Sequence, residues 1–105
     1  MDALTLKRRA TSGAAQVESM LIVLTAHLTE AEGTAITSGD HWAKPTFERD
    51  EGFMFHRDSL SQEGDFITLS AGFFGCIKRA HDLGCDWIMF DCDADVIEDI
   101  PSYEW

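Results

Sequence analysis

Three aspartates alternate with other residues near the end of the chain, at Asp91, Asp93 and Asp95. Carboxylates at this spacing open a calcium-binding loop, and Mg²⁺ also prefers such oxygen ligands. A calcium loop needs glycine at its sixth position and glutamate at its twelfth, where this chain has Val96 and Ser102. The string therefore favours a solvated acidic turn, with adventitious binding of Mg²⁺ or Ca²⁺ as the alternative.

An aspartate directly after an apolar strand also opens the nucleophile loop of haloacid-dehalogenase phosphatases, where the aspartate two residues on is the acid–base group. The fifth position of that loop is threonine or valine, and here it is Asp95. The loop also needs a lysine and further carboxylates downstream, and only ten residues follow Asp95 in the sequence. Phosphoryl transfer is therefore disfavoured.

The histidines and cysteines are too scattered to indicate a zinc site, because the sequence holds no C-x-x-C or H-x-x-x-H pair. Cys76 falls on the apolar stripe of an expected helix, which is typical of a small core residue. A nucleophilic pair of Cys92 with His27 or His56 would require the two side chains to be adjacent in the fold, and their separation in the sequence does not indicate this. The sequence therefore predicts no catalytic residue, no metal and no cofactor.

Charge narrows the class of partner. The chain has 8 basic and 19 acidic residues, a formal net charge of −11. Residues 1–17 carry +2, residues 18–81 carry −5 and residues 82–105 carry −8. Affinity for phosphate backbones and anionic lipids comes from lysine and arginine, so neither nucleic acid nor membrane is an expected partner. The charge suits another protein with a basic surface.

The compartment and the domain boundary follow from composition. The longest apolar run, residues 20–24, is far shorter than the ~18 residues that span a bilayer. Three cysteines, with no signal peptide apparent, predict free thiols in the cytoplasm. Residues 1–17 lack an apolar period and predict a flexible tail before a single domain of residues 18–105; translation could start at Met1 or Met20.

The elements that must position the aspartates follow from periodicity. Residues 20–26 form an apolar run typical of a buried central strand, and residues 30–37 follow a capping box as a weak helix. A second strand is expected at residues 52–58 after a loop, and a third at residues 87–90. Between these two lies an apolar helical stripe that ends at Gly84. The order β-α-β-α-β predicts a small α+β fold, with two helices on one face of a three- to four-stranded sheet.

The expected core combines these elements with the end of the chain. Tyr103 and Trp105 alternate with polar residues, so both rings can face the protein and hold the C-terminal segment in place. The predicted core residues are Leu21, Val23, Phe73, Ile77, Ala80, Trp87, Met89, Tyr103 and Trp105.

Two strings near the C-terminus resemble a small bacterial domain family of unknown function: GCDWIMFD at residues 84–91 and IEDIPSYEW at residues 97–105. The step Thr25-Ala26-His27 between a strand and a helix is similar as well. The resemblance covers about residues 18–105. It implies an accessory protein of plasmids, phages and other mobile elements, and it implies no catalytic residue.

These observations together favour a non-enzymatic module that binds another protein through an acidic face. The expected face consists of Asp91, Asp93, Asp95, Glu98 and Asp99. A more specific form of this hypothesis is an anti-defence inhibitor whose carboxylates imitate the charge of nucleic acid. The alternative is a metal-dependent hydrolase or ligand-binding protein that uses Asp91, Asp93 and Asp95 with His27 nearby. A homodimer formed through the aromatic middle strand is a further expectation.

Overall fold

The computed structural model describes residues 17–60 and 68–105. The tail expected at residues 1–17 lies outside this part except for Val17, whose side chain is exposed. Residues 61–67, between the expected second strand and the helical stripe, also lie outside it. None of the helices in the described part is long and apolar enough to cross a membrane.

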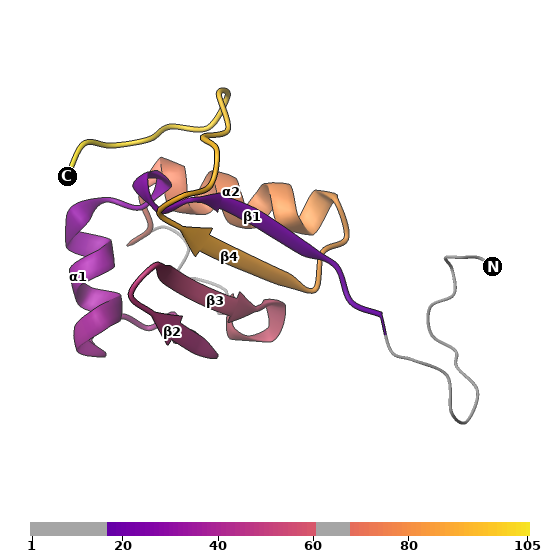
Figure 1. Ribbon diagram of the computed structural model, residues 1–105, viewed down its shortest axis with the longest axis horizontal. Coiled ribbons are helices and arrows are strands. Elements are labelled where there is room, and N and C mark those ends of the chain that lie inside the picture. The colour runs from indigo at the N-terminus through magenta and orange to yellow at the C-terminus, as the bar shows by residue number, and fades with distance from the viewer. Residues whose placement is uncertain (1–16, 61–67) are drawn as a thin grey trace.

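A four-stranded mixed sheet is the centre of the domain (Figure 1). Its strands are β1 (Met20–Leu24), β2 (Phe47–Arg49), β3 (Gly52–His56) and β4 (Trp87–Asp91), in the spatial order β1-β4-β3-β2. β1 is parallel to β4, whereas β3 is antiparallel to both of its neighbours. With its two helices, the sheet confirms the expected small α+β fold.

The first helix begins where the sequence predicts, and a serine caps the second. The first, α1 (Glu30–Ser38), opens with a capping box: Thr29 Oγ1 accepts from Glu32 N at 3.1 Å, and Glu32 Oε1 accepts from Thr29 N at 2.9 Å. The second, α2 (Ala71–Asp82), is capped by Ser70, whose hydroxyl accepts a hydrogen bond from the Phe73 amide. Each cap satisfies an amide that has no partner within its helix.

α2 lies behind β1 and β4 in Figure 1, and α1 lies beside the end of the sheet. The expected stop after α2 is confirmed, because Gly84 has a φ of +73°, which side chains other than glycine rarely adopt. The described part also contains two short 3₁₀ helices, η1 (Thr25–His27) after β1 and η2 (Arg57–Leu60) after β3.

The core forms between α2 and one face of the sheet. Val23, Phe55 and Phe90 are fully buried there, and they come from β1, β3 and β4. Phe73 of α2 packs its ring against Phe55 and Phe90, with centroids 6.0 and 5.4 Å apart. Aromatic rings at such distances contribute beyond the area that they bury. Val23 and Phe73 are therefore core residues, as predicted.

The predicted core is wrong for Trp87 and Met89. In β4 the buried positions are Ile88 and Phe90, so Trp87 and Met89 point to the other face of the sheet. Because all four residues of the run WIMF are apolar, the alternation of side chains in a strand does not indicate which two of them face the core. Trp105 is also 56% exposed. Of the other predicted residues, Ala80 is buried, and three are partly buried: Leu21, Ile77 and Tyr103.

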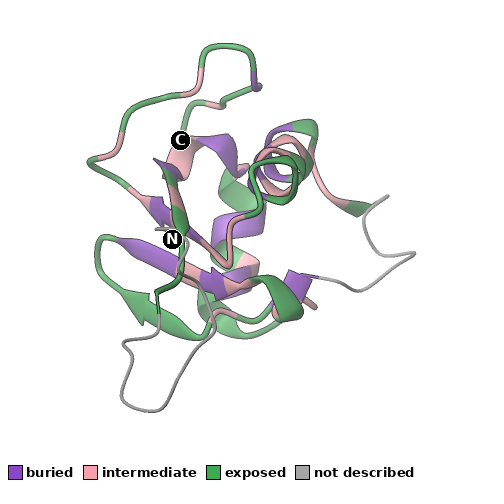
Figure 2. Ribbon diagram, turned by 90° about the vertical axis from the view of Figure 1, so that its right-hand side faces the viewer, coloured by how far each residue is buried: buried purple, intermediate pink, exposed green. Residues whose placement is uncertain are grey.

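Two other strand expectations are corrected. β1 is an edge strand and not the central one, and its Ile22 is 54% exposed. β2 lies within residues 40–52, which were expected to be a loop, and all three of its residues are exposed (Figure 2). A strand this short carries too few residues to show a period.

Glu32 joins the two helices. Its side chain is only 9% exposed, and besides completing the capping box it accepts hydrogen bonds from the amide and the hydroxyl of Ser70, both at 2.7 Å. One buried carboxylate thus holds the N-termini of α1 and α2 together, where the helix dipoles favour negative charge.

We expect Glu32→Ala to lower the free energy of unfolding by about 2–4 kcal/mol, because it leaves amides at two helix starts without an acceptor. Urea unfolding followed by circular dichroism measures the change. Glu30→Ala is the matched control, since Glu30 is exposed in the same helical turn, and should change stability by about 0.5 kcal/mol or less. Equal effects of the two substitutions would contradict the joining role of Glu32.

Candidate functional site

The acidic turn begins where β4 ends. Asp91, the last residue of β4, accepts a hydrogen bond from the Asp93 amide on Oδ1 at 2.8 Å. The amide of Cys92 donates to the carbonyl oxygen of Glu51 at 2.8 Å, which ties the turn to the β2–β3 hairpin. The Ala94 amide donates to the carbonyl oxygen of Asp91 at 3.1 Å. The turn therefore has a fixed shape and presents its carboxylates in a defined geometry.

The first two predicted aspartates meet in this turn. One ligand atom each from Asp91, Cys92 and Asp93 lies within 4.8 Å of the others, and Asp95 does not belong to the group. Partial desolvation of the Cys92 thiol and the neighbouring carboxylates, chiefly that of Asp93, raise its pKa. A thiol that stays protonated at neutral pH is a poor metal ligand and a poor nucleophile.

The remaining predicted residues lie further along the C-terminal segment, residues 92–105. Asp95 and Glu98 are exposed, and Asp99 pairs with Arg79 of α2 at 2.6 Å between Oδ2 and Nη2. The five acidic residues are thus spread from the end of β4 to the surface of α2. They form a line of charge along the segment and do not form one ligand cluster.

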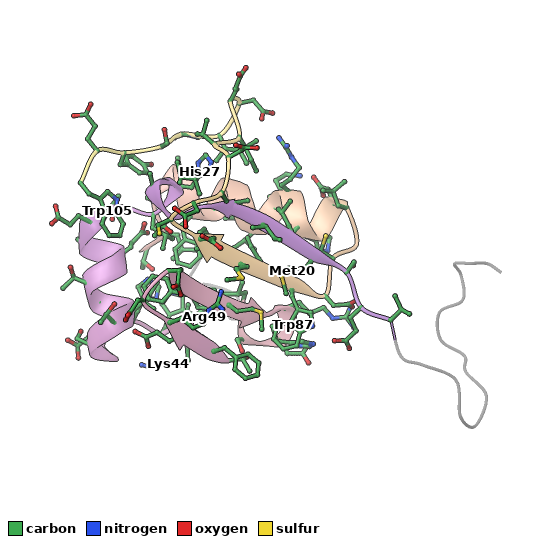
Figure 3. All side chains as sticks on the ribbon, in the orientation of Figure 1. Met20, His27, Lys44, Arg49, Trp87 and Trp105 are labelled. Atoms are coloured by element: carbon green, nitrogen blue, oxygen red, sulfur yellow. The ribbon has the colours of Figure 1, made fainter. Side chains whose placement is uncertain are left out.

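His27 is fully buried beneath the C-terminal segment (Figure 3). Its Nδ1 lies 2.8 Å from the carbonyl oxygen of Pro101, and its Nε2 lies 3.0 Å from the amide nitrogen of Ile97. Because a carbonyl only accepts and an amide N–H only donates, the ring is neutral with its proton on Nδ1. Both ring nitrogens are therefore engaged, and His27 has no lone pair for a metal or for Cys92.

Cys92 and His56 do not form a catalytic pair either. His56 pairs with Trp87 at the start of β4, whereas Cys92 follows the end of that strand. The His56 ring packs edge-on against the Trp87 ring, with centroids 4.8 Å apart. The buried thiol of Cys76 has its pKa raised to about 12 by desolvation, which leaves it inert, as expected of a core residue. No pair of a nucleophile and a base forms at these positions.

Several contacts anchor the rest of the C-terminal segment. The Tyr103 amide donates to the Ala26 carbonyl oxygen at 2.7 Å, and the Tyr103 hydroxyl accepts from the Gly72 amide at 3.1 Å. The Trp105 indole N–H donates to the Leu28 carbonyl oxygen at 2.9 Å. The expectation that Tyr103 and Trp105 hold this segment on the domain is confirmed, although Trp105 remains largely exposed.

Glycines let the segment approach the helices closely. A Cβ atom at Gly72 would lie 2.7 Å from the Pro101 carbonyl oxygen, and one at Gly33 would lie 2.3 Å from Cη2 of Trp105. At Gly72 the Cβ would clash with the backbone of the segment, and at Gly33 it would displace the Trp105 ring. The two helices therefore carry glycine where the C-terminal segment crosses them.

A cleft of about 730 Å³ opens beside the turn, in the range of volumes typical of ligand pockets. It lies between the end of β1, α1 and the β2–β3 hairpin, with Cys92 and Trp105 on its wall. Thr25 also lines it, and the buried Thr25 Oγ1 has no hydrogen-bond partner in the described part of the chain. The cleft offers hydroxyl groups and carboxylates for hydrogen bonds and no activated nucleophile.

Residues 20–105 match the model of the C-terminal domain of the family of unknown function DUF5983. The chain belongs to this family. No curated protein and no solved structure gives a significant match. Membership in DUF5983 confirms the resemblance to a family of unknown function, and the match extends over the whole anchored segment as well as the sheet.

The sequence did not indicate the structural roles of three residues that shape this DUF5983 domain. His27 and Ile100 are buried at 0% and 6% exposure and hold the C-terminal segment, and Glu32 joins the helices. The capping box placed Glu32 at a helix start, but its bonds to Ser70 span 38 positions in the chain. Such long-range contacts leave no periodic signal in a single sequence.

Proposed function

We propose that this domain is a non-enzymatic protein-binding module whose partner presents a basic surface, and that it acts in the cytoplasm. The anchoring of the acidic C-terminal segment is the observation that carries the proposal. His27, Tyr103 and Trp105 fix the segment by hydrogen bonds, so its carboxylates need little further ordering when a partner binds. Free cysteines at positions 76, 85 and 92 fit a reducing compartment.

Charge supports the same partner class. The segment and its flanks supply most of the net charge of −11, and such a field speeds the encounter with a basic protein. Against an enzyme stand the engaged ring of His27, the raised pKa of the Cys92 thiol and the ion pair of Asp99.

The test neutralises the exposed carboxylates of the segment in one variant, Asp93→Asn with Asp95→Asn and Glu98→Gln. Asp91 and Asp99 stay, because they bond to the turn and to Arg79. Immobilised wild-type protein should capture a basic protein from a bacterial lysate at low salt and release it as salt rises. We expect the variant to capture at least ten times less of it.

A matched control removes the same charge elsewhere, with Glu30→Gln, Asp40→Asn and Glu48→Gln, all exposed and outside the segment. Both variants change the net charge from −11 to −8. Equal capture by the two variants would show that only total charge matters, and salt-insensitive capture of a neutral partner would overturn the proposal.

The sharper form of the proposal is an anti-defence inhibitor carried by mobile elements, in which the carboxylates imitate nucleic-acid phosphates. The support is the line of charge from Asp91 to Asp99 and the resemblance of the two C-terminal strings. In this form the captured protein binds DNA, and duplex DNA competes with the domain for it. Capture that excess DNA leaves unchanged would reject this form and retain the broader proposal.

The alternative of a metal-dependent hydrolase or ligand-binding protein predicts a bound cation at Asp91, Asp93 and Asp95. We expect purified protein to contain less than about 0.1 metal ion per chain, and its melting temperature to stay unchanged when a chelator is added. Elemental analysis and thermal unfolding test both points. A stoichiometric metal, with a melting temperature that falls on chelation, would favour the alternative.

A further inference from the structure

The face of the sheet opposite α2 is apolar and uncovered in the described part of the chain. One row of paired residues crosses all four strands, Ile22, Met89, Met54 and Phe47 in that order. A second row holds Met20, Trp87 and His56. We call these seven residues the open face. Figure 3 looks onto it, with Met20 and Trp87 on the near side of the sheet and α2 behind.

Several residues of the open face are well exposed, and they adjoin one another. Ile22 is 54%, Phe47 56% and Met20 38% exposed, and Met54 and Met89 are half-buried between them. Contiguous apolar patches on small proteins mark interaction sites. Three of the four methionines of the chain lie here. Their side chains are flexible and polarisable, so they can repack to fit the surface of a partner.

Acidic groups flank the open face at both ends of the strands. Before β1, the carboxylate of Glu18 accepts a hydrogen bond from the Trp87 indole N–H at 2.7 Å. After β4, Asp91 continues the alternation of Trp87 and Met89, so its side chain lies on the same face. The two arginines nearby, at positions 49 and 57, are each paired with a carboxylate, at 3.6 and 3.2 Å.

We propose that the open face binds an amphipathic segment of the basic partner, with apolar side chains over the methionines and cationic side chains toward Glu18 and Asp91. This inference rests on the proposed function, and it adds the apolar half of the interface. The acidic segment begins at Asp91, so the two halves are continuous. A second copy fits poorly, because residues 18–105 carry a net charge of −13 and the two flanks would meet like charge.

The methionine methyl groups report on the open face directly. Protein labelled with ¹³C at the methionine methyl groups is titrated with a synthetic peptide of leucine and lysine whose leucines lie on one side of a helix. The control peptide has the same composition in an order that spreads the leucines around the helix. We expect the signals of Met20, Met54 and Met89 to shift with the first peptide, at an affinity at least ten times that of the control.

Variants then separate this inference from the proposed function. Ile22→Asn with Phe47→Ser should weaken binding of the amphipathic peptide at least tenfold, whereas Leu83→Asn, an exposed apolar residue beyond α2, should change it less than twofold. Peptide binding with unmoved methionine signals, or no binding, overturns the inference while salt-sensitive capture by the acidic segment stands. Methionine shifts that depend on protein concentration alone would identify a second copy of the chain as the occupant. Equal binding of a peptide with glutamine in place of lysine would contradict the proposed contacts of cationic side chains with Glu18 and Asp91.

Discussion

Truncation of the chain after Asp99 will lower the free energy of unfolding by at least about 4 kcal/mol. The truncation removes Ile100, which is 6% exposed and packs into the core, and burial of such a side chain alone contributes about 2–5 kcal/mol. It also removes Pro101, so that the buried N–H of His27 loses its acceptor. Because small domains are stable by only about 5–15 kcal/mol, this is a large part of the total, and the melting temperature of the truncated chain will fall by about 15 °C or more.

Thermal unfolding by circular dichroism measures this effect. The matched control keeps the chain length and changes only exposed residues of the same segment, Ser102→Ala with Glu104→Ala, and should melt within a few degrees of the wild type. A truncated chain that melts like the wild type would mean that residues 100–105 add nothing to the fold. The acidic residues would then lie on a loose strand, and the proposed function would lose its structural basis.

The local parts of the fold could be predicted because their signals are local. The capping box at Thr29 and Glu32, the serine cap of α2 and the glycine stop at Gly84 each depend on residues within a few positions of one another. The apolar stripe that ends before Gly84 likewise indicated a helix packed on the sheet. These signals place both helices and three of the strands, and with them the α+β fold.

The faces of the sheet could not be predicted, because the decisive strands are apolar at nearly every position. In β1 and β4, apolar side chains occur on both sides of the alternation, with Ile22 on the open face and Ile88 on the buried one, and nothing marks which side α2 covers. The sequence therefore favoured burial for Trp87 and Met89. The same lack of alternation is the reason that the open face exists, since a sheet with one solvated face normally alternates with polar residues.

The candidate site could be predicted only in its acidic part. The string from Asp91 to Asp95 indicated a turn after a strand, and the turn is there. The alternative that joined it to His27 depended on a distance between residues 64 positions apart, which the sequence does not contain. In the structure both ring nitrogens of His27 form hydrogen bonds with the backbone of the C-terminal segment. His27 therefore holds this segment in place and is not free to bind a metal.

Replacement of His27 by alanine will lower the free energy of unfolding by about 3–5 kcal/mol. The substitution empties the volume of a buried ring and leaves the Ile97 amide without an acceptor and the Pro101 carbonyl without a donor. Asparagine at this position can still donate toward Pro101, and glutamine can still accept from Ile97, so each should recover part of the loss. Urea unfolding of the three variants gives the order of stability, wild type above both amides and both amides above alanine.

Hydrogen exchange distinguishes an anchor from a residue that only fills space. If His27 holds the segment, His27→Ala will speed exchange of the Ile97 and Tyr103 amides, which bond to His27 and to Ala26 beside it, well beyond the change in global stability. The amide of Ile88, within β4, should change only by the global amount. Truncation in the His27→Ala background should then add less than it does in the wild type, because the two changes remove the same contacts. Additive effects, with uniform exchange across β4 and the segment, would show that His27 acts through packing alone, and that the acidic carboxylates are held in place by other contacts.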